Sequence, residues 1–206
     1  MRKFFVIASL IAISVMVLFF QISCAGEEGS KPLTKAEKID RGKYLVDFGG
    51  CNDCHSPKVM TDMGPVPDTT RLLSGYREDE ILPAADVSMT APGKWILMNG
   101  SITAFAGPWG ISYAANLTPD NATGIGTLSE EMFIKTLREG KWMGVGRPLM
   151  PPMPWQAIGG SWPGFGGLTN EDLGCIYAYL MSLKPIKNKV PDPVPPDQAG
   201  KLLAGK

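Results

Sequence analysis

Five consecutive residues, Cys51-Asn52-Asp53-Cys54-His55, constrain this chain more than any other feature. Two cysteines three positions apart, followed at once by a histidine, place two thiols where they can add across the vinyl groups of a haem while the imidazole reaches its iron. His55 is the single histidine among 206 residues. A two-histidine haem site, a His-rich zinc site and a His-dependent catalytic triad would therefore all compete for one side chain.

Other uses of a Cys-x-x-Cys pair fit the chain less well. A redox-active pair is expected in a βαβ context and a zinc site needs a second pair of ligands, and neither accompanies Cys51 and Cys54. The remaining cysteines, Cys24 and Cys175, have no partner at this spacing and no histidine after them. The sequence therefore predicts one haem c, bound covalently through Cys51 and Cys54, with His55 as its proximal iron ligand. Cys175 is expected to be a buried apolar residue.

The opposite side of the iron is left to a methionine, to an unusual lysine or tyrosine, or to no ligand, because there is no second histidine. Eleven methionines are available, and most are expected to be core or loop residues. Met153 differs because it lies in Pro151-Pro152-Met153-Pro154-Trp155. The prolines restrict the backbone there, and the tryptophan offers a flat apolar surface beside the haem. We predict Met153 as the distal ligand, with Met150 as the alternative.

The N-terminus has the pattern of an export signal. Arg2 and Lys3 precede an almost unbroken apolar run over residues 4–20, and Cys24 follows shortly after it. Three outcomes fit this pattern: cleavage before Cys24 with acylation of its sulfur, cleavage after Ala25, or retention of the run as a membrane anchor. We expect the first, which predicts a lipoprotein at the extracytoplasmic face of a membrane; cleavage after Ala25 would give a periplasmic protein.

Composition narrows the classes of protein further. Lys and Arg total 20, Asp and Glu total 20, and only 19% of residues are charged, so the formal net charge is zero. This balance argues against a nucleic-acid-binding protein with a basic surface. Hydrophobic residues, at 44%, are sufficient for a packed core, but 24 glycines and 18 prolines are too many for uninterrupted helices. We expect a mainly α fold with long loops and a small β-hairpin insertion.

Capping and periodicity signals place the expected elements. Thr34 and Glu37 form a capping box before apolar residues that end at a Gly-Gly pair, which predicts a helix over residues 34–48. The other expected elements are helices over residues 129–139 and from Thr169 to before Pro185, and a hairpin around Asn99-Gly100 within residues 95–105.

These elements divide the chain into four parts. Residues 1–23 are the predicted export signal and residues 24–33 a flexible linker. Residues 34–185 are predicted to form a single haem-binding domain. Residues 186–206 are rich in proline, and we expect an extended tail there that the core does not need.

The order of these parts resembles class I cytochrome c: a first helix that runs into Cys51–His55, a methionine in a proline-rich loop, and a closing helix. Several short segments also resemble single-haem units of bacterial periplasmic cytochromes, including the cytochrome subunits of membrane-bound alcohol dehydrogenases. Those segments are Gly107-Pro108-Trp109-Gly110, Ala115-Asn116-Leu117-Thr118-Pro119-Asp120, Thr123-Gly124-Ile125-Gly126 and Gly146-Arg147-Pro148 through Trp155.

The resemblance implies His/Met ligation of the iron and crossed first and last helices. The crossing would bring Gly42 near Tyr177 or Tyr179. The resemblance also implies that the loop of Asn116 and the side chain of Arg147 lie near the haem edge, where Arg147 either pairs with a propionate or remains a solvated loop residue.

These features together favour electron transfer. An iron held by imidazole and thioether exchanges single electrons with little change in geometry. We therefore expect a carrier, not an enzyme, that serves periplasmic or membrane-bound redox proteins, either alone or as a subunit of a dehydrogenase or respiratory complex. The alternative is a haem c enzyme or gas sensor with a weak distal ligand, although no general acid or base is evident beside the motif.

Overall fold

The computed structural model describes residues 31–164 and 166–204. Residues Thr34–Lys206 cluster into one compact unit. The predicted export signal over residues 1–23 and the predicted acylation site, Cys24, lie outside the described residues, as does most of the predicted linker. Within the described ranges, no helix combines the length and apolar character needed to cross a membrane.

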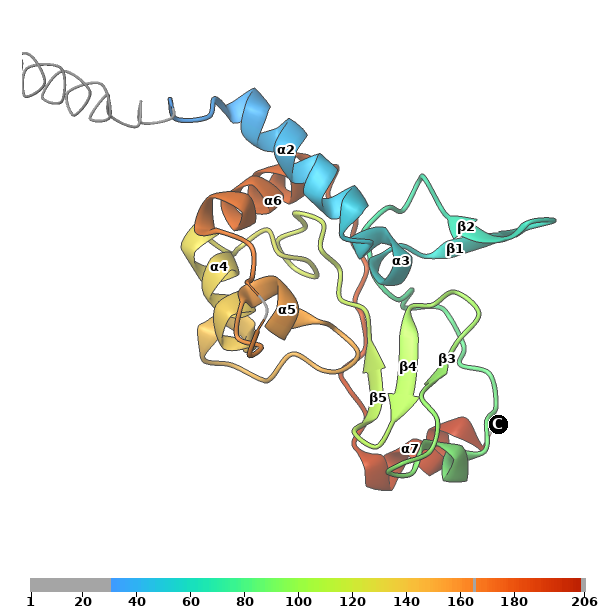
Figure 1. Cartoon of the computed structure of the whole chain (residues 1–206). Helices are drawn as coiled ribbons and strands as arrows, with labels where there is room; N and C mark the ends of the chain where they lie inside the picture. The colour runs from blue at the N-terminus through green and yellow to red at the C-terminus, as the bar shows by residue number, and fades with distance from the viewer. Residues whose placement is uncertain (1–30, 165, 205–206) are drawn as a thin grey trace, which may run out of the picture. The chain divides into compact units, whose positions relative to one another are not determined.

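The unit Thr34–Lys206 contains both helices and strands. Its helices are α2 (Lys35–Phe48), α3 (Cys51–His55), α4 (Glu130–Glu139), α5 (Trp155–Gly159), α6 (Asn170–Ser182) and α7 (Pro196–Leu203), with 3-10 turns at Val87–Thr90 and Trp142–Gly144. Its strands are β1 (Lys58–Thr61), β2 (Gly64–Pro67), β3 (Leu97–Met98), β4 (Ala104–Gly107) and β5 (Gly110–Tyr113). Figure 1 shows α2 crossing α6 at one end of this unit and the sheet of β3, β4 and β5 with α7 at the other.

Local capping explains why the three predicted helices form where they do. The Thr34 hydroxyl accepts from the N–H of Glu37, and the Glu37 carboxylate accepts from the N–H of Thr34 at 2.7 Å, which completes the capping box of α2. The hydroxyls of Ser129 and Thr169 accept from the N–H groups three residues on and so cap α4 and α6, and Gly140 ends α4 in the left-handed conformation. These three predictions are confirmed.

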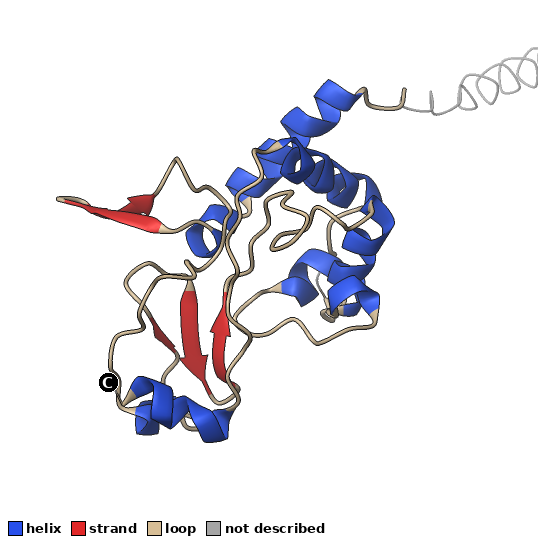
Figure 2. Cartoon of the chain, turned by 180° about the vertical axis from the view of Figure 1, so that it is seen from behind, coloured by secondary structure: helices blue, strands red, loops and turns tan. Residues whose placement is uncertain are grey.

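The β-structure exceeds the single hairpin that the sequence predicts. The hairpin around Asn99-Gly100 is present as β3 and β4, with Leu97 opposite Ala106, but β5 extends it to a three-stranded antiparallel sheet. A second hairpin, β1–β2, follows α3 (Figure 2). The two prolines in β2 are unusual in a strand, so the sequence does not predict it. A two-stranded hairpin tolerates them because the outer edge of each strand has no neighbouring strand that would need its N–H groups. The fold is therefore mixed, with helices and small antiparallel sheets.

The segment after residue 185 also differs from the extended tail that its prolines suggest. Pro196–Leu203 is the helix α7, and its first residue is a proline, which the first turn of a helix tolerates. Ala199 and Leu203 are buried against Ile111 of β5. Val194 exchanges two backbone hydrogen bonds with Ile111, at 2.8 and 2.9 Å. The prediction of an extended tail was therefore wrong for residues 196–203.

The contact between α2 and α6 organises the main core. A Cβ atom added at Gly42 would lie 1.9 Å from the carbonyl oxygen of Cys175 and 2.8 Å from the Cβ of Tyr179. Only glycine permits this approach, and it confirms the expected proximity of Gly42 and Tyr179. Cys175 itself is fully buried, as predicted.

An ion pair fastens the same two helices. The Nε of Arg41 on α2 donates to Oδ1 of Asp172 on α6 at 2.7 Å, and Thr169 donates to the other carboxylate oxygen at 2.9 Å. Burial by itself would raise the pKa of Asp172, but these hydrogen bonds and the positive charge of Arg41 hold it below its ordinary value. Asp172 is therefore ionised wherever the fold is intact at neutral pH.

Candidate functional site

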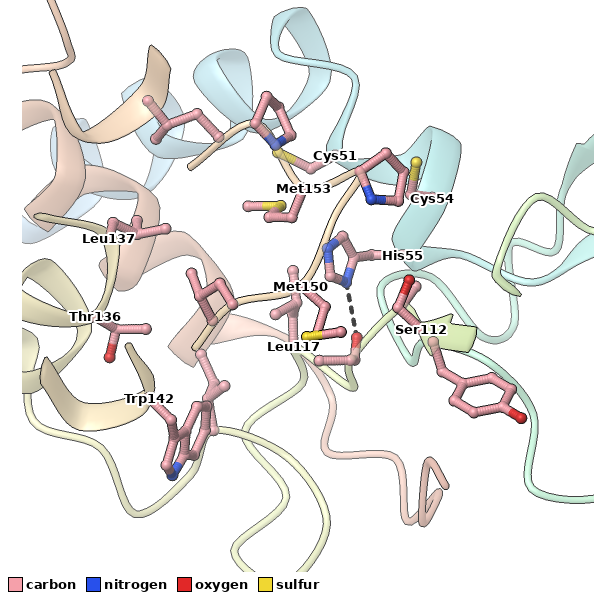
Figure 3. Close-up of a pocket in the computed structure, with 18 of the residues that line it drawn as sticks. Cys51, Cys54, His55, Ser112, Leu117, Thr136, Leu137, Trp142, Met150 and Met153 are labelled. Atoms are coloured by element: carbon pink, nitrogen blue, oxygen red, sulfur yellow. Dashed lines mark hydrogen bonds between the residues drawn. The ribbon is translucent and has the colours of Figure 1, made fainter. Parts of the chain in front are cut away.

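A largely apolar cavity lies between the α2–α4–α6 core and the three-stranded sheet. The predicted site residues Cys51, Cys54, His55 and Met153, together with the alternative Met150, all line it (Figure 3). Apolar side chains from the core complete the wall. These are Val46, Leu117, Ile125, Leu128, Phe133, Leu137, Ile176 and Leu180. The fold thus brings α3 and the proline-rich loop before α5 to one cavity.

The short helix α3 presents both thiols on one side. Gly50 precedes it with a φ of 65°, a left-handed conformation that turns the chain sharply out of α2. Positions three apart share one face of a helix, so Cys51 and Cys54 point in similar directions. The ammonium group of Lys58 donates to the carbonyl oxygens of Asn52 and Asp53, at 3.1 and 2.9 Å. This cation stabilises the carbonyl end of α3.

The imidazole of His55 is held in one orientation. Its Nδ1 lies 2.8 Å from the carbonyl oxygen of Ala115. A carbonyl oxygen can only accept, so Nδ1 carries the proton and Nε2 keeps a free lone pair. Burial lowers the pKa of His55, and this outweighs the opposite effect of the hydrogen bond to Ala115. The ring is therefore neutral, as a metal-binding imidazole must be.

The environment of the two thiols differs from that of a redox-active pair. Burial raises the pKa of Cys51 to about 11, and burial also raises the pKa of Cys54 above its ordinary value. Both are free cysteines. Redox-active Cys-x-x-Cys pairs depend on a lowered thiol pKa, so these surroundings favour the haem interpretation of the motif over the dithiol interpretation.

The loop of residues 149–154, here called the methionine loop, has one hydrogen bond at its start and one within it. The N–H of Leu149 donates to the carbonyl of Gly140 at 2.8 Å, and the N–H of Met153 donates to the carbonyl of Met150 at 3.2 Å. Both methionines are half-buried. Met153 also packs against the main apolar core, which restricts its side chain further. The choice between them as iron ligand stays a prediction.

The expectations for Asn116 and Arg147 are met unequally. Arg147 lines the cavity and is exposed, and its pairing with a propionate stays a prediction. Asn116 is buried and does not line the cavity, although Ala115 and Leu117 beside it do. Its amide nitrogen donates to the carbonyl of Ile186 at 2.8 Å. Asn116 therefore fastens this loop to the C-terminal segment.

Two contributors to the site escape sequence reasoning. The carbonyl of Ala115 that orients His55 is a backbone group, so it cannot be predicted from the type of side chain at that position. Ser112 on β5 also lines the cavity, and its hydroxyl donates to the carbonyl of Pro151 in the methionine loop. No local sequence pattern predicts the strand β5 or its contact with the loop around Pro151.

The residues present fit a haem c. Two neighbouring thiols can form thioether bonds, the imidazole has a free Nε2, and a thioether-bearing loop borders the same cavity. Apolar walls suit a flat apolar macrocycle, and an arginine at the exposed rim suits its charged propionates. Cys51, Cys54, His55 and Met153 would hold the group, with Arg147 at its polar edge.

Comparison with known proteins points in the same direction. No protein-family model matches the chain. It is 36% identical over 149 residues to the fructose dehydrogenase cytochrome subunit of Gluconobacter japonicus, covering 72% of this chain and 22% of that protein. It is 29% identical over 143 residues to the gluconate 2-dehydrogenase cytochrome c subunit of Pantoea cypripedii, covering 69% and 22%. It is 38% identical over 88 residues to the alcohol dehydrogenase (quinone) cytochrome c subunit of Gluconobacter oxydans, covering 41% and 17%. In each case the chain spans less than a quarter of the relative's length.

Proposed function

Because this chain is a homologue of the cytochrome c subunits of bacterial dehydrogenases, we propose that it is a monohaem c-type cytochrome of the class I fold. Cys51 and Cys54 would hold the haem through thioether bonds, and Nε2 of His55 and the thioether of Met153 would bind its iron. When bound, the haem supplies one-electron chemistry between Fe(II) and Fe(III).

The protein's own side chains prepare the site for fast electron exchange. The hydrogen bond from His55 to the Ala115 carbonyl fixes the imidazole, so this ligand need not reorient when the charge changes. The apolar wall keeps water from the iron, and the soft thioether of Met153 favours the reduced state, which raises the potential. The crossing of α2 and α6 at Gly42 supports the class I fold, because it encloses the cavity between the first and last long helices.

The partners we propose are redox proteins. The relatives are named cytochrome subunits of fructose, gluconate and alcohol dehydrogenases, which supports a role as the electron-carrying subunit of a dehydrogenase or as a carrier between such an enzyme and a respiratory acceptor. We assign the chain electron transfer and no substrate chemistry of its own.

The location that we propose is the periplasm or the outer face of a membrane, where haem c is attached. The export signal and Cys24 support this, and acylation of Cys24 would provide the anchor. Cell fractionation of wild type and Cys24→Ala tests the anchor: the wild type should be in the membrane fraction and the variant in the soluble periplasmic fraction. Mass spectrometry that finds Met1 or Gly26 at the mature N-terminus would rule acylation out.

The observation that carries the proposed function is that the attachment motif, an imidazole with a free Nε2 and the methionine loop line one cavity. The test is expression with and without the double substitution Cys51→Ser and Cys54→Ser. Wild type should retain haem through denaturing electrophoresis, show sharp α and β bands when reduced, and resist binding of carbon monoxide. The double variant should lose the haem on denaturation. Covalent haem in the double variant, or none in the wild type, would refute the proposal.

A further inference from the structure

Ser112 occupies a position between the two sides of the cavity. Its side chain is buried, and its hydroxyl donates to the carbonyl of Pro151 in the methionine loop. The same oxygen accepts from the indole N–H of Trp109 at 3.2 Å. Three residues further along the chain, the carbonyl of Ala115 accepts from His55. One short segment, residues 110–115, therefore contacts both the proximal histidine and the loop across the cavity.

The methionine loop has few other means of attachment. Pro151, Pro152 and Pro154 have no N–H to donate, and the N–H of Met153 is used within the loop, on the carbonyl of Met150. Among the hydrogen bonds of the described residues, the one from Ser112 to Pro151 is the only one that joins residues 150–153 to another part of the chain. Leu149 before them is held by the carbonyl of Gly140, but residues 150–153 themselves depend on the Ser112 hydroxyl for their polar attachment to the rest of the protein.

The strand that carries Ser112 is itself firmly held. β4 pairs with β5 on one side, with Phe105 opposite Ser112. On the other side, Val194 of the C-terminal segment pairs with Ile111. Because β5 has hydrogen-bonded neighbours on both edges, it offers a fixed point against which a loop can be positioned.

We propose that Ser112 is a positioning residue for the distal iron ligand, because its hydroxyl fastens the Pro151 carbonyl and thereby holds the methionine loop over the haem. This inference rests on the proposed function, in which a methionine of this loop binds the iron. Residues 110–115, which comprise β5 and the two residues after it, would then support both proposed iron ligands.

Loss of the Ser112 hydroxyl should weaken the distal ligand without removing the haem. A thioether on a less restrained loop leaves the iron more often, so an added ligand competes with it more successfully. A neutral hydrogen bond of this kind corresponds to roughly a fivefold change in an equilibrium constant. We therefore expect ferric Ser112→Ala to bind imidazole about fivefold more tightly than wild type.

The experiment compares three variants as holoproteins. Ser112→Ala removes the hydroxyl and Ser112→Thr restores one. Thr90→Val is the matched control, because Thr90 is also buried and its hydroxyl donates to the carbonyl of Val87 at 2.8 Å, but it does not line the cavity. The measurements are covalent haem content, imidazole affinity, the weak far-red band of thioether-ligated ferric haem, and hydrogen exchange at the N–H of Met153.

The expected result is specific to Ser112. Ser112→Ala should bind imidazole more tightly, weaken the far-red band and exchange the Met153 N–H faster, whereas Ser112→Thr should move back toward wild type and Thr90→Val should match it. Unchanged imidazole affinity and exchange in Ser112→Ala, in a protein that carries haem, would overturn the positioning role. A wild type with no covalent haem, or with no far-red band, would instead overturn the proposed function on which the role depends.

Discussion

Replacement of Gly42 by alanine tests the helix crossing on which the cavity depends. The added Cβ would lie 1.9 Å from the carbonyl oxygen of Cys175, and real Cβ atoms essentially never approach closer than 3.0 Å. Because the obstructing atom belongs to the backbone of α6, no side chain can rotate away. The two helices would have to separate by about 1 Å in a close-packed region.

Two opposing effects set the size of the destabilisation. Overpacking a core costs about 1–3 kcal/mol, and a rigid backbone obstacle favours the upper part of this range. Alanine in place of glycine within a helix raises the free energy of unfolding by about 1 kcal/mol through its higher helix propensity. We therefore expect Gly42→Ala to lower the free energy of unfolding by about 2 kcal/mol.

Gly200 provides the matched control, because it also lies within a helix, α7. A Cβ there would meet Val87 Cγ1 at 3.5 Å, an ordinary van der Waals contact. Gly200→Ala should therefore stabilise the protein by up to about 1 kcal/mol through helix propensity alone.

The assay is urea unfolding of the ferric holoproteins, followed by far-ultraviolet circular dichroism. The midpoint should fall for Gly42→Ala and stay equal or rise for Gly200→Ala, with similar m values. If Gly42→Ala were as stable as wild type, the close approach of α2 to the Cys175 carbonyl would be refuted, and with it the argument that only glycine fits there.

Three further predictions concern single contacts. Because the pKa of Asp172 is lowered in the folded state, its ion pair with Arg41 should stabilise the protein fully above about pH 4. The difference in unfolding free energy between wild type and Asp172→Asn, measured by urea unfolding, should shrink as the pH falls below that value. A difference that stays constant with pH would contradict the assignment. The far-red band should disappear in Met153→Ala and persist in Met150→Ala; the reverse would move the distal ligand to Met150. Asn188 is fully buried, and its side chain bonds three backbone groups. Asn188→Leu should therefore lower the free energy of unfolding by about 3 kcal/mol in thermal or urea unfolding, whereas a neutral outcome would show that these three hydrogen bonds add no net stability.

The helices with clear caps could be predicted because their signals are local. Thr34 with Glu37 and Ser129 before α4 satisfy backbone groups within a single turn, so a short stretch of sequence contains the whole interaction. The attachment motif is equally local, since Cys51–His55 lies within one helical turn and a half.

The rest of the site could not be predicted because it depends on pairs that are distant in sequence. β5 is four residues long, and its pairing with Val194 has no sequence pattern. The prolines before α7 suggested an extended segment, although the buried residues Ala199 and Leu203 have the four-residue spacing of one helix face. The carbonyl of Ala115 could not be identified from side-chain chemistry at all, because any residue there would present the same atom.

The pairing of Ile111 with Val194 also has a consequence for the order of assembly. The attachment motif is complete within the five neighbouring residues Cys51–His55, whereas this pairing joins two segments that are far apart in the sequence. Contacts between such distant positions form late, because the entropy of closing the intervening loop must be overcome first. We therefore expect the sheet wall of the cavity to be fastened to the C-terminal segment late in folding, which would leave the thiols and the imidazole accessible to a large planar group until then.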